Sequence, residues 1–111
     1  MDIEKFIEEW ISVSNSYDTA KYLEFYTENA VLDDPSVGRK FNKKKGIREY
    51  FESYFIGYKT QVKKVELIVK DDHQAHLEVE FTGDFPEGKL GGTFDFKFNG
   101  GKIEFVLADL I

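Results

Sequence analysis

The chain has 111 residues, of which 41% are hydrophobic and 32% charged, and its formal net charge is −6 at pH 7. These proportions are typical of a folded globular protein, and the length predicts one domain over residues 1–111. No apolar run exceeds four residues, Phe105 to Ala108, so we expect no membrane partner and no membrane-spanning segment. The first residues lack the profile of a signal peptide, and we therefore expect a cytoplasmic protein.

The residue types that serve metal and redox chemistry are scarce. There is no cysteine and there are two histidines, which excludes a disulfide framework, a thiolate site and a Cys nucleophile. We predict no metal site and no cofactor. His76 shares a predicted strand face with two glutamates, and this pattern more often faces solvent or a subunit interface than a metal. The unusual feature is instead the aromatic content of 16%, which is high for so small a core.

The first half of the chain has the periodicity of helices. Over residues 3–14, the i, i+3, i+4, i+7 spacing puts one set of side chains on a single face: Ile3, Phe6, Ile7, Trp10, Ile11 and Ser14. Asp18 is a suitable N-cap for a second helix, which we expect to carry Tyr22, Phe25 and Tyr26 and to end at Glu28 and Asn29. A third helix is predicted to begin at Gly46 and to present Ile47, Tyr50, Phe51, Tyr54, Phe55 and Tyr58.

A strand and a polar loop separate the second and third predicted helices. Residues 30–32 are short, apolar and strand-like, and Pro35 biases Asp34 toward extended or turn geometry. The loop that follows contains Gly38 and five basic residues within 39–45. A solvated loop is the ordinary explanation of such a run, although it could also steer an anionic ligand. Because the remaining charges are strongly acidic, we expect no nucleic-acid partner.

From Thr60 onward the pattern alternates with period two, which predicts strands joined by hairpins at residues 71–74 and 99–101 and by a loop at 83–88. One strand face carries Leu90, Gly92, Phe94, Phe96 and Phe98. In the last strand, alternation predicts an apolar face of Ile103, Phe105, Leu107 and Asp109, and an outer face that includes Val106 and Ala108. Helices followed by hairpin-connected strands predict an α+β fold with helices on one face of an antiparallel sheet.

The order of these motifs resembles the nuclear transport factor 2-like superfamily, and within it the SnoaL-like polyketide cyclases and ketosteroid isomerase-like proteins. The resemblance rests on Asn15-x-x-Asp18, Phe25-Tyr26, Glu28 to Val31, Asp33-Asp34-Pro35, Gly38, Gly46 to Phe51 and Phe96 to Ile103. It covers nearly the whole chain. It implies a cone-shaped roll, in which a strongly curved, mostly antiparallel sheet wraps three N-terminal helices around an apolar pocket.

Asp34 is the leading candidate for chemistry. In the isomerases that the chain resembles, the aspartate before this proline is the general base that moves a proton next to a carbonyl. A carboxylate that ends an apolar strand beside aromatic walls would also have a raised pKa, which suits a base. The alternative is that Asp33 and Asp34 only form a turn, because Asp-Pro starts turns unaided.

The partners of that base do not match the isomerases. In those enzymes a tyrosine and a protonated aspartic acid form the oxyanion hole. The resemblance places Trp10 at the position of the helix tyrosine and Phe94 at the position of the aspartic acid. Phe94 has no donor, and Asp95 lies on the opposite strand face. The steroid isomerase constellation is therefore absent, which implies a different substrate or no chemistry.

Other side chains could complete a pocket. Asp109 is a candidate second catalytic carboxylate beside Asp34, although a solvated position near residue 111 would explain it equally. The expected ligand-binding residues are aromatic: Trp10, Tyr17, Tyr50, Tyr54, Phe94, Phe96 and Phe105. The same rings could instead be ordinary core. We expect a small apolar or aromatic ligand and a homodimer formed through the outer sheet face, with either isomerase-like, cyclase-like or dehydratase-like catalysis or a non-catalytic binding or dimerisation role.

Overall fold

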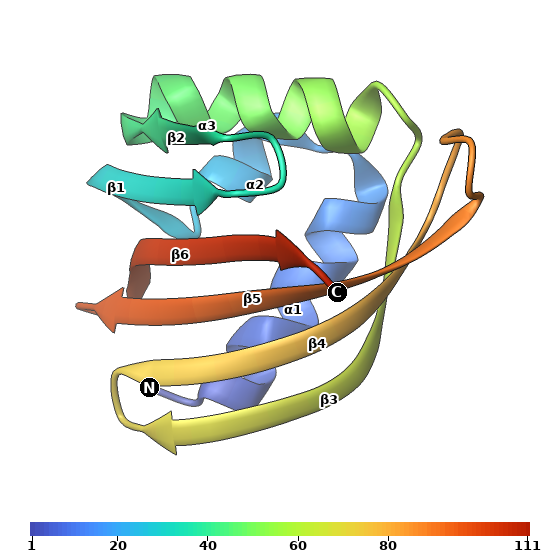
Figure 1. Ribbon diagram of the computed structural model, residues 1–111. Coiled ribbons are helices and arrows are strands. Elements are labelled where there is room, and N and C mark those ends of the chain that lie inside the picture. Colours follow the sequence, from blue (N-terminus) through green and yellow to red (C-terminus); the bar gives the residue numbers. More distant parts are fainter.

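A computed structural model describes residues 1–111 and has helices on one side of a curved, six-stranded sheet (Figure 1). The strand order is β2-β1-β6-β5-β4-β3, and every pairing is antiparallel except that of β1 with β6. The elements are α1 (Ile3–Ser16), α2 (Thr19–Leu23), β1 (Tyr26–Asp34), β2 (Arg39–Asn42), α3 (Lys43–Phe51), a π-helical turn η1 (Glu52–Ile56), β3 (Gln61–Asp71), β4 (Gln74–Thr82), β5 (Lys89–Asn99) and β6 (Lys102–Leu110). This is the expected α+β fold.

Helices α1 and α2 begin at aspartate caps. The Asp2 side chain accepts a hydrogen bond from the Lys5 amide, and the Asp18 side chain accepts one from the Lys21 amide. Helix α2 ends at Leu23, so the expected extension to Asn29 is wrong. Residues 26–29 instead join the apolar stretch 30–32 in one long strand, because β1 gains a pairing partner in β6 that periodicity alone does not reveal.

The basic segment is more ordered than its composition indicates. Residues 39–42 form strand β2, which pairs with β1, and α3 begins at Lys43 rather than at Gly46. Gly38, with φ of 68°, lies in the turn between the two strands, a backbone conformation that suits glycine. In Figure 1, α3 runs alongside this hairpin, so that the basic residues flank the edge of the sheet.

Irregular pairing bends the sheet around the helices. Register shifts occur between Lys64 and Glu66 in β3 and between Lys97 and Phe98 in β5. At the second shift Lys97 pairs with Phe105 and Phe98 with Ile103, so Glu104 is an extra residue in β6. It reverses the expected alternation of β6: Val106 and Ala108 point inward and are buried, whereas Phe105 and Leu107 lie on the outer face. The prediction that Val106 and Ala108 face outward is wrong.

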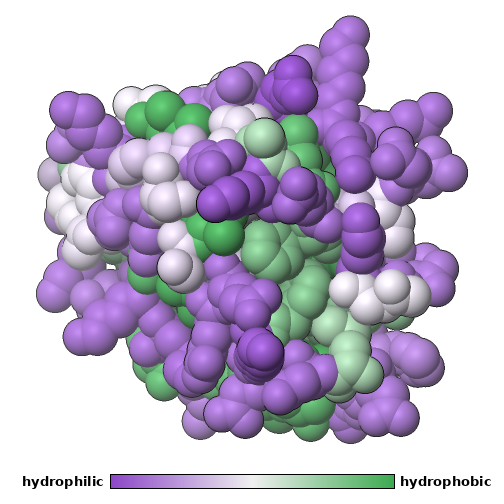
Figure 2. All heavy atoms as spheres, turned by 180° about the vertical axis from the view of Figure 1, so that it is seen from behind, coloured by the Kyte–Doolittle hydropathy of each residue, from purple (hydrophilic) through white to green (hydrophobic).

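The core lies between the helices and the concave face of the sheet, and it is dominated by aromatic rings. Trp10 contacts Phe94 and Phe96 edge to face, at centroid distances of 5.0 and 5.3 Å. Figure 2, which views the molecule from behind, shows a mostly hydrophilic surface crossed by a strip of hydrophobic side chains. None of the helices is long and apolar enough to cross a membrane.

Candidate functional site

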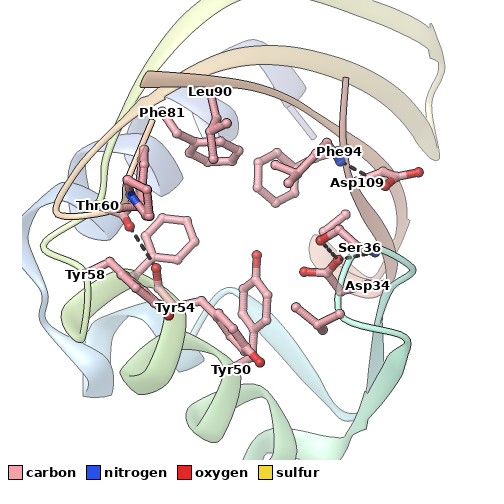
Figure 3. A pocket seen from close by; sticks show the side chains of 16 residues that line it. Asp34, Ser36, Tyr50, Tyr54, Tyr58, Thr60, Phe81, Leu90, Phe94 and Asp109 are labelled. Atoms are coloured by element: carbon pink, nitrogen blue, oxygen red, sulfur yellow. Dashed lines mark hydrogen bonds between the residues drawn. The ribbon is translucent and has the colours of Figure 1, made fainter. Parts of the chain in front are cut away.

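A cavity of about 260 Å³ opens between α3, η1 and the concave face of β5 and β6. Most of its lining is apolar or aromatic, with a few polar groups at its edge (Figure 3). The lining residues are Asp34, Ser36, Val37, Tyr50, Tyr54, Phe55, Tyr58, Thr60, Phe81, Phe85, Pro86, Leu90, Phe94, Ala108, Asp109 and Leu110. An apolar cavity with few polar groups is the usual form of a small-molecule site.

The turn after β1 fixes the carboxylate of Asp34 at the edge of this cavity. Asp34 is the last residue of β1 and is 7% exposed. Its Oδ1 accepts a hydrogen bond from the Ser36 amide at 3.0 Å and another from the Ser36 hydroxyl at 2.5 Å. Both hydrogen bonds end on the same oxygen, so Oδ2 is the oxygen that a ligand can contact.

The surroundings of Asp34 change its acidity. Burial raises the pKa of Asp34 above its ordinary value, and the negative charge of Asp109 adds to this rise. The hydrogen bonds from Ser36 and the Val37 amide oppose it, because they stabilise the ionised form. The carboxylate is therefore held in a fixed position and is more basic than a solvated aspartate.

The charge of Asp34 affects the pKa of the Tyr50 hydroxyl. Tyr50 lies on α3, and Figure 3 shows it and Asp34 on neighbouring walls of the cavity. Burial raises the pKa of Tyr50 well above its ordinary value, and the charge of Asp34 raises it further. The phenol therefore keeps its proton and can donate a hydrogen bond into the cavity.

The π-helical turn positions the rings at the cavity mouth. In η1 the Gly57 amide donates to the Glu52 carbonyl at 2.9 Å, and after it the Thr60 amide donates to the Phe55 carbonyl at 2.8 Å. The Thr60 hydroxyl donates to the Tyr54 carbonyl at 2.7 Å. Tyr54 and Tyr58 stack with centroids 6.5 Å apart, and both line the cavity. Such π segments are frequent at functional sites.

Two of the expected ligand-binding residues belong to the core instead of the cavity. Trp10 and Phe96 are at most 1% exposed and do not line the cavity, so their predicted placement is wrong. The Trp10 Nε1–H donates to the Tyr26 hydroxyl at 3.3 Å, and that hydroxyl donates to Tyr22 at 2.6 Å. The indole N–H is therefore engaged inside the core and is not available to a ligand.

The predicted placement of Tyr17 and Phe105 in the cavity is also wrong. Tyr17 ends α1 with φ of 59°, and its hydroxyl accepts a hydrogen bond from Gln61 at 2.8 Å, which ties α1 to β3. Phe105 lies on the outer face because Glu104 is an extra residue in β6. Its ring lies 5.8 Å from the Lys97 ammonium.

The remaining candidates, Tyr50, Tyr54, Phe94, Asp34 and Asp109, do line the cavity. Asp109 is exposed at its rim, where its Oδ1 accepts a hydrogen bond from the Leu110 amide at 2.9 Å. In Figure 3 its side chain points away from the centre, so the cavity does not bring the two carboxylates together as a pair.

Several lining residues are missing from the sequence-based prediction. The contact with Ser36 could have been found, because an aspartate side chain in a turn commonly accepts a hydrogen bond from the backbone amide two residues on. Phe81 lies in a strand that the sequence predicts, but the sequence does not mark it as a ligand-binding residue. Phe85 lies in the loop between β4 and β5, for which the sequence predicts no direction. Its ring packs against Tyr58 at a centroid distance of 6.4 Å.

Comparison with known families supports the assignment of the fold. The family model of the SnoaL-like domain matches residues 7–106, and the chain therefore belongs to the SnoaL-like domain family. This confirms the resemblance inferred from the sequence. No curated protein matches the sequence of the chain closely enough to count as a relative.

Several solved structures share the fold of this chain. A candidate polyketide cyclase from Sinorhizobium meliloti has a TM-score of 0.84 at 18% identity, over 94% of this chain and 93% of its own. A candidate ketosteroid isomerase from Kribbella flavida has a TM-score of 0.83 at 13% identity, over 96% and 76%. The epoxide hydrolase/cyclase-like enzyme SalBIII, of pyran ring formation in salinomycin, has a TM-score of 0.84 at 20% identity, over 97% and 89%. Because these sequence identities are all 20% or less, the similarity to these structures shows a shared fold only.

Proposed function

We propose that the chain binds a small, mostly apolar molecule in the cavity and that Asp34 acts on it as a general base. The observation that carries this proposal is the Asp34 carboxylate, which has Oδ1 fixed by Ser36 and Oδ2 unpartnered at the edge of an apolar cavity. A raised pKa brings a carboxylate closer to the range in which a base is effective. The reaction class is proton abstraction from a carbon next to a carbonyl, as in isomerisation or cyclisation.

Such a base needs a group that stabilises the negative charge formed on the carbonyl oxygen. Phe94 offers no donor, and the Trp10 N–H is engaged with Tyr26. Of the lining tyrosines, Tyr50 is the one whose pKa the charge of Asp34 raises, so its hydroxyl is the donor assigned to this role. In this scheme Asp34 takes the proton from carbon, and Tyr50 donates a hydrogen bond to the enolate oxygen.

Exchange of hydrogen for deuterium tests this scheme without knowledge of the natural substrate. Indanone, a bicyclic ketone of suitable size, is incubated with the protein in D2O, and loss of its α-proton signal is followed by NMR. We expect faster exchange with the wild type and at least about a 100-fold loss in Asp34→Asn. Asp33→Asn is the matched control, because Asp33 pairs with Lys40 and Leu107 on the outer face and should retain the activity. Equal exchange in the wild type and Asp34→Asn would exclude Asp34 as the base.

The alternative is a binding or dimerisation module without catalysis. It is favoured by the absence of a donor at Phe94 and by the engagement of the Trp10 N–H with Tyr26. A ligand screen by thermal shift separates the two roles. A compound that raises the melting temperature of both the wild type and Asp34→Asn, with no exchange in either, would support binding alone.

We further propose a homodimer formed through the outer sheet face. This face carries the half-buried side chains of Val31, Phe105 and Leu107, with Ile68, which is 46% exposed, toward β3. Beside them the His76 ring nitrogen lies 2.6 Å from the Asp95 carboxylate. Mixed apolar and polar surfaces of this kind are common in interfaces between subunits.

A further inference from the structure

The charged side chains that line the cavity have one sign. Among the lining residues these are the carboxylates of Asp34 and Asp109, and the other members are apolar, aromatic or hydroxyl-bearing. The chain as a whole carries a net charge of −6. A cleft lined by negative groups with low-dielectric walls attracts cations and repels anions.

The walls of the cavity are also suited to a cation. Seven lining rings follow one another with centroid distances between 5.7 and 6.5 Å, in the order Phe94, Phe81, Phe55, Tyr50, Tyr54, Tyr58 and Phe85. The face of an aromatic ring carries negative potential and attracts an ammonium group within about 6 Å of its centroid. This attraction is larger where water is excluded, as in a partly closed cavity.

The volume sets the size of the ligand. At the packing density of protein interiors, 260 Å³ holds roughly a dozen non-hydrogen atoms. A monocyclic or bicyclic skeleton with one short polar arm has this size. A larger fused-ring skeleton would extend beyond the mouth.

We propose that the cavity binds hydrophobic organic cations, with an ammonium group at Asp34 and a monocyclic or bicyclic skeleton against the aromatic rings. The proposal rests on the proposed function in one respect, namely that the cavity is a ligand site. Oδ2 of Asp34 would accept the hydrogen bond of the ammonium group, while Ser36 continues to hold Oδ1. A cation in this position also lowers the pKa of Asp34, so such ammonium compounds would be ligands of the cavity and not substrates of the proposed base.

Three probes of one shape and different charge test the proposal. They are naphthylmethylamine, which is a cation near neutral pH, naphthalenemethanol, which is neutral, and naphthoic acid, which is an anion. Their affinities are measured by calorimetry or NMR titration. For the wild type we expect the amine to bind at least about tenfold more tightly than the alcohol, and the acid to bind most weakly.

Variants then locate the cation. In Asp34→Asn the affinity for the amine should fall to that for the alcohol, whereas Asp33→Asn should keep the preference. Tyr54→Leu retains apolar surface but removes a ring, and should weaken binding of the amine more than that of the alcohol. This second variant keeps the test decisive if Asp34→Asn folds poorly, which its melting curve would show.

The possible failures are distinguishable. Equal affinities for amine and alcohol in the wild type would overturn the preference for cations and leave the cavity as a ligand site. A preference that survives both Asp34→Asn and Tyr54→Leu would overturn the assignment of the cation to this place. Binding of none of the three probes would overturn the ligand cavity itself, and the proposed function with it.

Discussion

At the scale of single residues, Asp34 and Ser36 form the most specific unit of the site. The Ser36 hydroxyl hydrogen-bonds the ionised carboxylate and so lowers the pKa of Asp34, against the larger effect of burial. Ser36→Ala should therefore raise the pKa of Asp34 further. Carbon-13 NMR of the carboxyl group measures the shift, with Ser53→Ala, an exposed serine outside the cavity lining, as the control. An unchanged midpoint would mean that the backbone amides alone hold the carboxylate.

The same carboxylate makes stability depend on pH. Because the pKa of Asp34 is raised in the folded state, the folded chain holds this proton over a range where the unfolded chain has lost it. The contribution of Asp34 to stability therefore falls as pH rises from the unfolded pKa to the folded pKa, and is constant above it. Relative to the wild type, Asp34→Asn should gain stability across this window. Urea unfolding at several pH values checks this, and a parallel pH dependence of both proteins would contradict it.

The buried hydrogen bonds of Trp10, Tyr26 and Tyr22 are the second residue-scale unit. Tyr26→Phe removes the acceptor of the Trp10 N–H inside the core and should cost about 1–3 kcal/mol of unfolding free energy. Tyr17→Phe removes a partly exposed hydrogen bond to Gln61 and should cost less than about 1 kcal/mol. Urea unfolding with an unchanged slope measures both, and equal costs would contradict the assignment of the buried pair.

At the scale of elements, the extra residue Glu104 in β6, opposite Lys97 and Phe98 of β5, decides which face the later residues of β6 occupy. Val106 is fully buried on the inner face, and Val31 is half-buried on the outer face. Val106→Thr buries a hydroxyl group and should destabilise the fold by about 1–3 kcal/mol. Val31→Thr, the matched exchange, should cost less than about 1 kcal/mol. A larger cost for Val31→Thr than for Val106→Thr would contradict the burial of Val106 on the inner face.

Strands β4, β5 and β6 show which features of the fold can be predicted from the sequence and which cannot. Alternation places the inward side chains of β4 and of β5, through Phe98, correctly, because period two needs only local pattern. A bulge depends on how two strands pair, and one extra residue moves every later side chain to the other face. The position of Asp34 follows from Pro35 and the end of an apolar strand. The sequence does not show whether Trp10 belongs to the core or to the cavity lining, because aromatic residues of both kinds have the same spacing.

At the scale of the whole molecule, the proposed homodimer can be tested through its outer face. Leu107→Lys places a charge in the middle of this face and should convert a dimer to a monomer without loss of the fold. Sedimentation velocity and circular dichroism measure the two effects. Val37→Lys, on an exposed turn, is the control and should leave the assembly unchanged. A monomeric wild type would exclude the dimer.

The parallel pairing of β1 with β6 has a consequence for the order in which the molecule forms. The hairpin of β1 and β2, which carries Asp34, is joined to the rest of the sheet only through β6, the last strand of the chain. Parallel pairing between residues so far apart in sequence is slow, because the long intervening loop must first be closed. During synthesis on the ribosome, therefore, the other strands and the helices can be complete in length while the carboxylate of residue 34 is still in water. We therefore expect the cavity to acquire its acidic edge only when residues 102–110 have left the exit tunnel.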